Sequence, residues 1–134
     1  MGRNIIYCIW IYRYIIYICS MISKDLLKGT LKTIVLKLLE ENGRMYGYEI
    51  TREVERLTEG KIQLSWGALY PALHKLESDH LISSEEESIG KRVRKYYTLT
   101  ESGTGAAKEK VREFIDFVTI MGRVLDTGPS LNLA

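Results

Sequence analysis

The sequence predicts a mainly helical α+β fold with one small antiparallel sheet. Apolar residues recur at helical spacing in three segments between residues 25 and 77. Two short alternating segments follow at 81–87 and 93–99, and one long amphipathic segment covers 101–125. A chain of 134 residues has the size of one domain with a modest core.

The first two helical segments have clear ends. The first is expected from residue 25 to residue 42, and Gly43 ends it because glycine readily adopts the left-handed conformation found just past a helix end. The second is expected at 46–58, before a Glu-Gly break. Alternating apolar residues then predict a brief strand at 61–64.

The third helix is expected at 64–77, with the Ser65 hydroxyl capping its first turn. Pro71 removes one backbone donor and predicts a bend. One face carries an apolar stripe made of Leu69, Leu73 and Leu76. The opposite face carries aromatic or basic groups, namely Trp66, Tyr70, His74 and Lys75. A helix with a buried leucine stripe and a protruding aromatic face is a candidate recognition helix.

The two alternating segments predict a β-hairpin around a loop at 88–90. Four positive charges fall within five residues, namely Lys91, Arg92, Arg94 and Lys95. On charge alone, a solvated hairpin balanced by the three glutamates at 85–87 is an equal alternative. The order of three helices, a short strand before the third helix and a basic hairpin is that of a winged helix, whose third helix enters the major groove of DNA.

The last helix is expected at 101–125, capped by Thr100. Its 25 residues span about 37 Å, which is too long for so small a domain to cover. Apolar residues repeat with spacings of 4 and 3, as in a heptad seam: Ala107, Val111, Phe114, Val118, Met121 and Leu125. This seam predicts a two-fold homodimer, and the alternative is a helix folded back on its own domain.

The ends of the chain differ from the middle. Residues 1–22 form an Ile- and Tyr-rich hydrophobic leader with Arg13 inside its 18-residue apolar run. Three interpretations stay open: a start of translation at Met21, a membrane or partner-binding segment, and a signal peptide. The first is favoured, so the leader is expected to lie outside the native fold. The sequence thus divides into leader 1–22, winged helix domain 23–100, dimerisation helix 101–125 and flexible tail 126–134.

Charge and cysteine content narrow the class of protein. Both cysteines, Cys8 and Cys19, lie in the leader, so the rest can form no disulfide framework, which suits a cytoplasmic location. The net charge of +2 falls to zero without residues 1–20, which hold two arginines and no acid, leaving 17 bases and 17 acids. An interaction with DNA must therefore depend on where the charges lie.

The sequence gives no support for an enzyme, a cofactor or a metal site. It contains neither a P-loop nor a G-x-S-x-G motif. His74 and His80 stand about 240° apart around a helix, too far to share a metal ion.

From Asp25 to about Leu125, roughly three quarters of its length, the chain resembles the PadR family of bacterial transcriptional regulators, in the short form with a single C-terminal helix. The resemblance rests on the amphipathic last helix and on LLKGTLKTIVLKLL (26–39), YGYEI (46–50), LSWGALYPALHKLE (64–77) and GKRVRKYYTLTESG (90–103). It implies a winged helix-turn-helix dimer that represses a promoter and is often released by a small aromatic or lipophilic compound.

The resemblance also implies roles for single residues. Those expected to face DNA on the recognition helix are Ser65, Trp66, Gly67, Ala68, Tyr70 and His74. Those expected in the wing are Lys91, Arg92, Arg94 and Lys95, with Tyr46 and Tyr48 near the phosphate contacts of the second helix. Ala68 departs from the family pattern, in which a Ser or Thr hydroxyl is common, so one DNA contact is in doubt. Trp66 buried under the wing and Tyr70 at the edge of the core are the structural alternatives.

The resemblance places an effector between the two long helices of a dimer and the first helices, where Phe114 and Phe117 would line its cavity. A purely structural position for Phe114 in the dimer seam is the alternative. The expected partners are therefore double-stranded DNA, a second copy of the chain and a small effector, and a membrane is disfavoured. The rival function is a dimeric winged-helix adaptor that binds protein and is tethered to a membrane by the leader.

Overall fold

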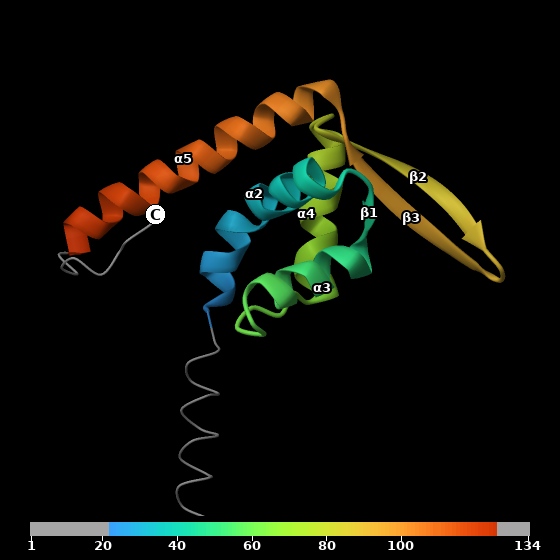
Figure 1. Cartoon of the computed structure of the whole chain (residues 1–134), viewed down its shortest axis with the longest axis horizontal. Helices are drawn as coiled ribbons and strands as arrows, with labels where there is room; N and C mark the ends of the chain where they lie inside the picture. Colours follow the sequence, from blue (N-terminus) through green and yellow to red (C-terminus); the bar gives the residue numbers. More distant parts are fainter. Residues whose placement is uncertain (1–21, 126–134) are drawn as a thin grey trace, which may run out of the picture.

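The computed structural model describes residues 22–125. In chain order the elements are α2 (Lys24–Asn42), β1 (Met45–Tyr46), α3 (Gly47–Leu57), α4 (Trp66–Ser78), β2 (Ile82–Ile89), β3 (Arg92–Leu99) and α5 (Glu101–Leu125). Helices α2, α3 and α4 form a cluster; the β2–β3 hairpin projects from one side of it, and α5 extends away on the other (Figure 1). The predicted fold class, a winged helix rich in α structure, is confirmed.

Helix α2 is capped by local hydrogen bonds at both ends. The Ser23 hydroxyl accepts a hydrogen bond from the Leu26 N–H at 3.2 Å, which satisfies one free donor of the first turn. At the other end Gly43 has a φ of +75°, and its N–H donates to the Leu39 carbonyl at 2.9 Å. The predicted end of this helix at Gly43 is confirmed.

The sheet has the order β1-β3-β2, with both pairs antiparallel. The strand predicted at 61–64 is wrong, because the first strand is instead the pair Met45–Tyr46, which lies against Tyr97 and Tyr96. In the 61–64 segment the Ile62 N–H donates to the Thr58 hydroxyl at 3.1 Å. The alternation seen there reflects two side chains that pack on the core without a neighbouring strand.

The leucine stripe of α4 lies at the centre of the core. Leu69, Leu73 and Leu76 are buried, as predicted, together with Leu36 and Leu39 of α2. Each such side chain contributes about 1.5–3 kcal/mol when it leaves water. Helix α4 runs from residue 66 to residue 78 as one element, with Pro71 inside it. The core thus holds α4 by one face and leaves the other face free.

Helix α5 has the predicted bounds, 101–125. The Thr100 hydroxyl accepts from the Gly103 N–H at 3.0 Å and donates to the His80 carbonyl at 2.7 Å, so the predicted cap is confirmed. Ala107 was predicted in the dimer seam, but it is 0% exposed within the protomer's own core. The prediction for Ala107 is therefore wrong, because the first turns of α5 pack on their own domain before the helix leaves it (Figure 1).

The predicted leader up to residue 21 and the tail 126–134 lie outside the described residues. What was expected of them, and of the division of the chain into 1–22, 23–100, 101–125 and 126–134, stays a prediction. Between residues 22 and 125, no helix has both the length and the apolar composition that a membrane span requires.

Candidate nucleic-acid interface

The outward face of α4 presents an aromatic stripe. Trp66 and Tyr70 are 46% and 48% exposed, and their rings stack with centroids 5.4 Å apart. His74 follows one turn later on the same side and is also exposed. Trp66 is therefore not buried under the wing, and the Tyr70 side chain is half exposed. These three side chains form the surface that we call the α4 stripe.

Gly47 explains how the Trp66 ring is placed. A Cβ atom on Gly47 would lie only 3.0 Å from the ring, so the ring rests directly on the backbone at the start of α3. The glycine stands between Tyr46 and Tyr48 in the chain, so the Trp66 ring contacts the segment that carries both predicted tyrosines. This role of Gly47 was not predicted, although its position inside the YGYEI motif was a signal.

The remaining predicted residues at the start of α4 border a hollow next to α2. Ser65, Gly67 and Ala68 help to line this hollow, which has a volume of about 700 Å³. Ser65 occupies the N-cap position, but its side chain makes no capping bond, so the predicted hydroxyl cap is wrong. The reason is that the Ala68 N–H, a usual donor to such a cap, donates to the Ser65 carbonyl at 3.1 Å.

The wing is longer than predicted and closes in a tighter turn. Ile89 pairs with Arg92, so only Gly90 and Lys91 form the loop, and Gly90 has a φ of +61°. Lys91 and Arg92 are exposed near its tip, and neither makes an ion pair with any residue between 22 and 125. Their charges are free to meet an outside partner.

Alternation along β3 separates the other two charges. Arg94 lies over the Tyr46 ring, with the guanidinium carbon 4.7 Å from the ring centroid. Lys95 points to the opposite face, where its ammonium lies 3.2 Å from the Glu77 carboxylate of α4. Of the four predicted wing charges, Lys95 alone is engaged in an ion pair within the described part of the chain.

Five side chains from three segments form what we call the Tyr–Arg cluster: Arg44, Tyr46, Tyr48, Arg94 and Tyr96. The Tyr46 ring lies 6.2 Å from that of Tyr48 and meets that of Tyr96 edge-on at 5.4 Å. The Arg44 guanidinium lies 3.8 Å from the centroid of Tyr96. An exposed cation–π contact contributes about 0.5–1 kcal/mol. The cluster therefore stabilises the position of the wing by a modest amount.

Arg44 has a second partner in the wing. Its Nη2 lies 2.7 Å from the Glu87 carboxylate, and this hydrogen bond raises the pKa of the guanidinium above its ordinary value. Arg44 and Tyr96 were not predicted as site residues because their partners are distant in the chain, 43 positions away in the case of Glu87. The glutamates at 85–87 therefore do not simply balance the basic strand, since Glu87 is paired with Arg44.

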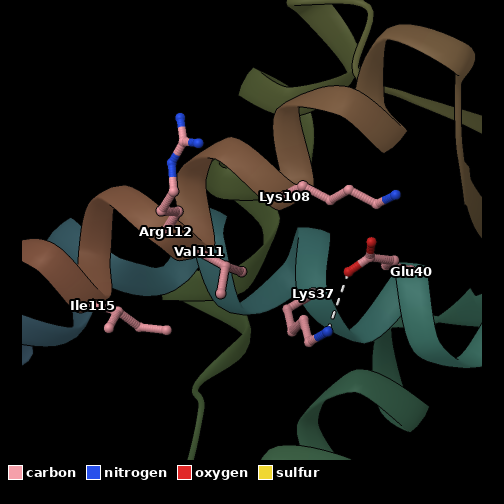
Figure 2. Close-up of a pocket in the computed structure, with 6 residues that line it drawn as sticks. All are labelled: Lys37, Glu40, Lys108, Val111, Arg112 and Ile115. Carbon is pink, nitrogen blue, oxygen red and sulfur yellow. Dashed lines mark hydrogen bonds and ion pairs between the residues drawn. The ribbon is translucent and has the colours of Figure 1, made fainter.

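The predicted effector residues are exposed rather than gathered around a cavity. Phe114 and Phe117 lie on the outer part of α5, at 38% and 55% exposure. A hollow of about 320 Å³ does separate α5 from α2, but neither phenylalanine lines it (Figure 2). Its lining consists of Lys37, Glu40, Lys108, Val111, Arg112 and Ile115. In residues 22–125 no group of three His, Cys, Asp or Glu side chains is placed to hold a metal ion.

Comparison with known proteins decides the family. Residues 35–109 match the model of the transcriptional regulator PadR-like family. The chain belongs to this family. A transcriptional regulator from Clostridium thermocellum has a similar structure, with a TM-score of 0.68 and 30% identity over 77% of this chain and 97% of that one.

Two further proteins are similar to this PadR-like chain over part of their length. The transcriptional regulator YqjI of Escherichia coli is 34% identical over 90 residues, which are 67% of this chain and 41% of that protein. Bacillus subtilis PadR, solved in complex with operator DNA, has a TM-score of 0.55 and 29% identity over 60% of this chain and 46% of that one. The PadR-like chain thus spans less than half of these two relatives.

Proposed function

We propose that this PadR-like regulator is a DNA-binding repressor that acts as a homodimer. The observation that carries the proposal is the α4 stripe of Trp66, Tyr70 and His74 lying beside a wing whose Lys91 and Arg92 make no ion pair within residues 22–125. A helix in this position reads base edges in the major groove, while a wing contacts the backbone. The likeness to Bacillus subtilis PadR, which was solved with operator DNA, supports the same role here.

Helix α5 supports the homodimer. Beyond Ala107 it leaves large apolar side chains uncovered by its own domain, which include Phe114, Ile115, Phe117, Ile120, Val124 and Leu125. An exposed apolar surface of this length is typical of an interface with another chain. A two-fold pair would present two copies of α4 to half-sites about 34–36 Å apart, one turn of duplex DNA.

Regulation by a small aromatic or lipophilic effector is the finer part of the proposal. Phe114 and Phe117 are exposed on one protomer, so a cavity lined by them requires a second copy of α5. An effector held there would favour a dimer geometry in which the two α4 helices no longer match the spacing of the half-sites. Repression would then be relieved without any change within α4.

An electrophoretic mobility shift with the DNA upstream of the gene tests the proposal. The wild-type protein is expected to give a discrete complex that weakens steeply with salt, because phosphate neutralisation releases counterions. Replacing Arg92 and Arg94 together by alanine should abolish the complex under the same conditions. Any residual binding should have a salt slope smaller by about 0.9 for each phosphate that is no longer neutralised. A matched control is Lys108→Ala with Arg112→Ala, which removes the same charge from α5.

The outcome separates the proposal from the rival adaptor function. A protein-binding adaptor would retain DNA weakly and without preference for the upstream region, and the two double variants would then behave alike. A complex that survives removal of both Arg92 and Arg94 would exclude these two arginines from DNA recognition.

A further inference from the structure

Arg94 and Glu87 are direct neighbours in the wing that are not paired with each other. The register places Glu87 opposite Arg94, and residues opposed in this way project from the same face of the sheet. The Glu87 carboxylate is nevertheless bound by Arg44, at 2.7 Å, while the Arg94 guanidinium lies over Tyr46. The nearest cross-strand acid to Arg94 is therefore held by a third residue.

Arg44 is well placed to hold that acid. It lies between the Gly43 turn and β1, and its guanidinium contacts both strands of the wing, at Glu87 of β2 and at the Tyr96 ring of β3. A guanidinium can stack on an aromatic ring and bind a carboxylate at the same time, because its donors lie at the edge of the plane. This double contact favours Arg44 over Arg94 as the partner of Glu87.

We propose that Arg44 is a positioning residue that sequesters Glu87 and so keeps the Arg94 charge available for a DNA phosphate. The inference rests on the proposed DNA-binding function. Without Arg44, Glu87 would turn to its cross-strand neighbour, and the resulting Arg94–Glu87 pair would remove one positive charge from the wing. It would also draw Arg94 away from the Tyr46 ring, over which it now lies.

A double-substitution cycle tests this mechanism against the same upstream DNA. Arg44→Ala should weaken binding by about tenfold per dimer, and Glu87→Gln alone should leave the affinity unchanged or raise it. The double variant should return to within about twofold of the wild type, because the freed acid is gone. Arg44→Lys, which keeps the charge opposite Glu87, should bind better than Arg44→Ala.

Two other results would overturn the proposal. If Arg44 only braced the wing, Glu87→Gln would break the same brace and weaken binding as much as Arg44→Ala does. If Arg44 touched DNA itself, the double variant would stay as weak as Arg44→Ala. Only sequestration predicts rescue by removing the acid.

A measurement without DNA keeps the inference separate from the proposed function. In nitrogen-15 NMR spectra of the free protein, the Arg94 Nε–H should exchange more slowly with water in Arg44→Ala, because it gains Glu87 as an acceptor. The double variant should lack this protection. Unchanged exchange in Arg44→Ala would overturn the sequestration, whereas protection combined with no DNA binding by the wild type would overturn the proposed function alone.

Discussion

The Glu77 carboxylate at the end of α4 pairs with the Lys95 ammonium in the middle of β3, at 3.2 Å. Glu77 also accepts a hydrogen bond from the Ser84 hydroxyl of β2. One side chain therefore ties α4 to both strands of the wing. A phosphate that binds Lys95 would have to displace Glu77, so of the four wing charges Lys95 is the one best suited to setting the angle between wing and helix.

This contact predicts a pH-dependent contribution to stability. The Ser84 hydrogen bond and, after it, Lys95 hold the pKa of the Glu77 carboxyl below its ordinary value of 4.5, against the opposing effect of burial. Because the pKa is lower in the folded state, the ionised carboxylate stabilises the fold above pH 4.5, and this contribution is lost as the pH falls through the folded-state value. Glu77→Gln should lower the free energy of unfolding by roughly 0.5–1 kcal/mol at about pH 7 and by less at about pH 3.

Urea unfolding at the two pH values checks the prediction. Glu86→Gln is the control, because Glu86 is exposed and has no ion pair among the described residues, so its substitution should have a smaller effect at neutral pH. A Glu77→Gln effect of the same size at both pH values would show that packing, and not charge, is responsible.

Alanine substitutions at two glycines of α5 are expected to change stability in opposite directions. Gly103 lies against the backbone of Leu81, and a Cβ atom there would overlap the Leu81 carbonyl oxygen, whereas nothing lies within 4 Å of a Cβ on Gly105. Gly103→Ala should lower the free energy of unfolding by about 1–3 kcal/mol, since backbone must move. Gly105→Ala should raise it by about 0.5–1 kcal/mol, since alanine is the better helix former. Thermal unfolding followed by circular dichroism compares the two, and equal effects would contradict the close approach of α5 to Leu81.

The dimer proposal predicts that a charge in the seam separates the protomers. Val118→Asp should elute as a monomer in size-exclusion chromatography with light scattering, because a buried carboxylate without a partner is costly. Thr119→Asp adds the same charge to the neighbouring exposed position and should remain a dimer. If Val118→Asp also remains a dimer, α5 does not associate through this seam.

Local sequence patterns predicted most of the secondary structure. The end of α2 at Gly43, the leucine stripe of α4 and the bounds of α5 follow from glycine, apolar spacing and a threonine cap, all of which act within a few residues. The prediction was wrong for the 61–64 segment and missed β1. A two-residue strand exists only because β3 lies beside it, and no local pattern specifies such a neighbour.

Some features of the candidate site could likewise be predicted from the sequence, and others could not. Trp66 and Tyr70 could be predicted on the exposed face of α4, because the buried face was already defined by its leucines. The partners of the wing charges could not be predicted. Because side chains alternate along β3, Arg94 and Lys95 point to opposite faces of the sheet. The side chains that they contact there depend on how β1 and α4 pack against the sheet.

By itself the sequence determined the order of the helices and of the wing hairpin, the basic composition of the wing and the family to which the chain belongs, because these depend on spacing and on local chemistry. Only the tertiary structure decided that Glu87 binds Arg44, that Glu77 holds Lys95 and that Ala107 is buried in its own domain. Such contacts join segments far apart in the chain. They form where packing of the core brings those segments together, and the local sequence around each residue does not identify its partner.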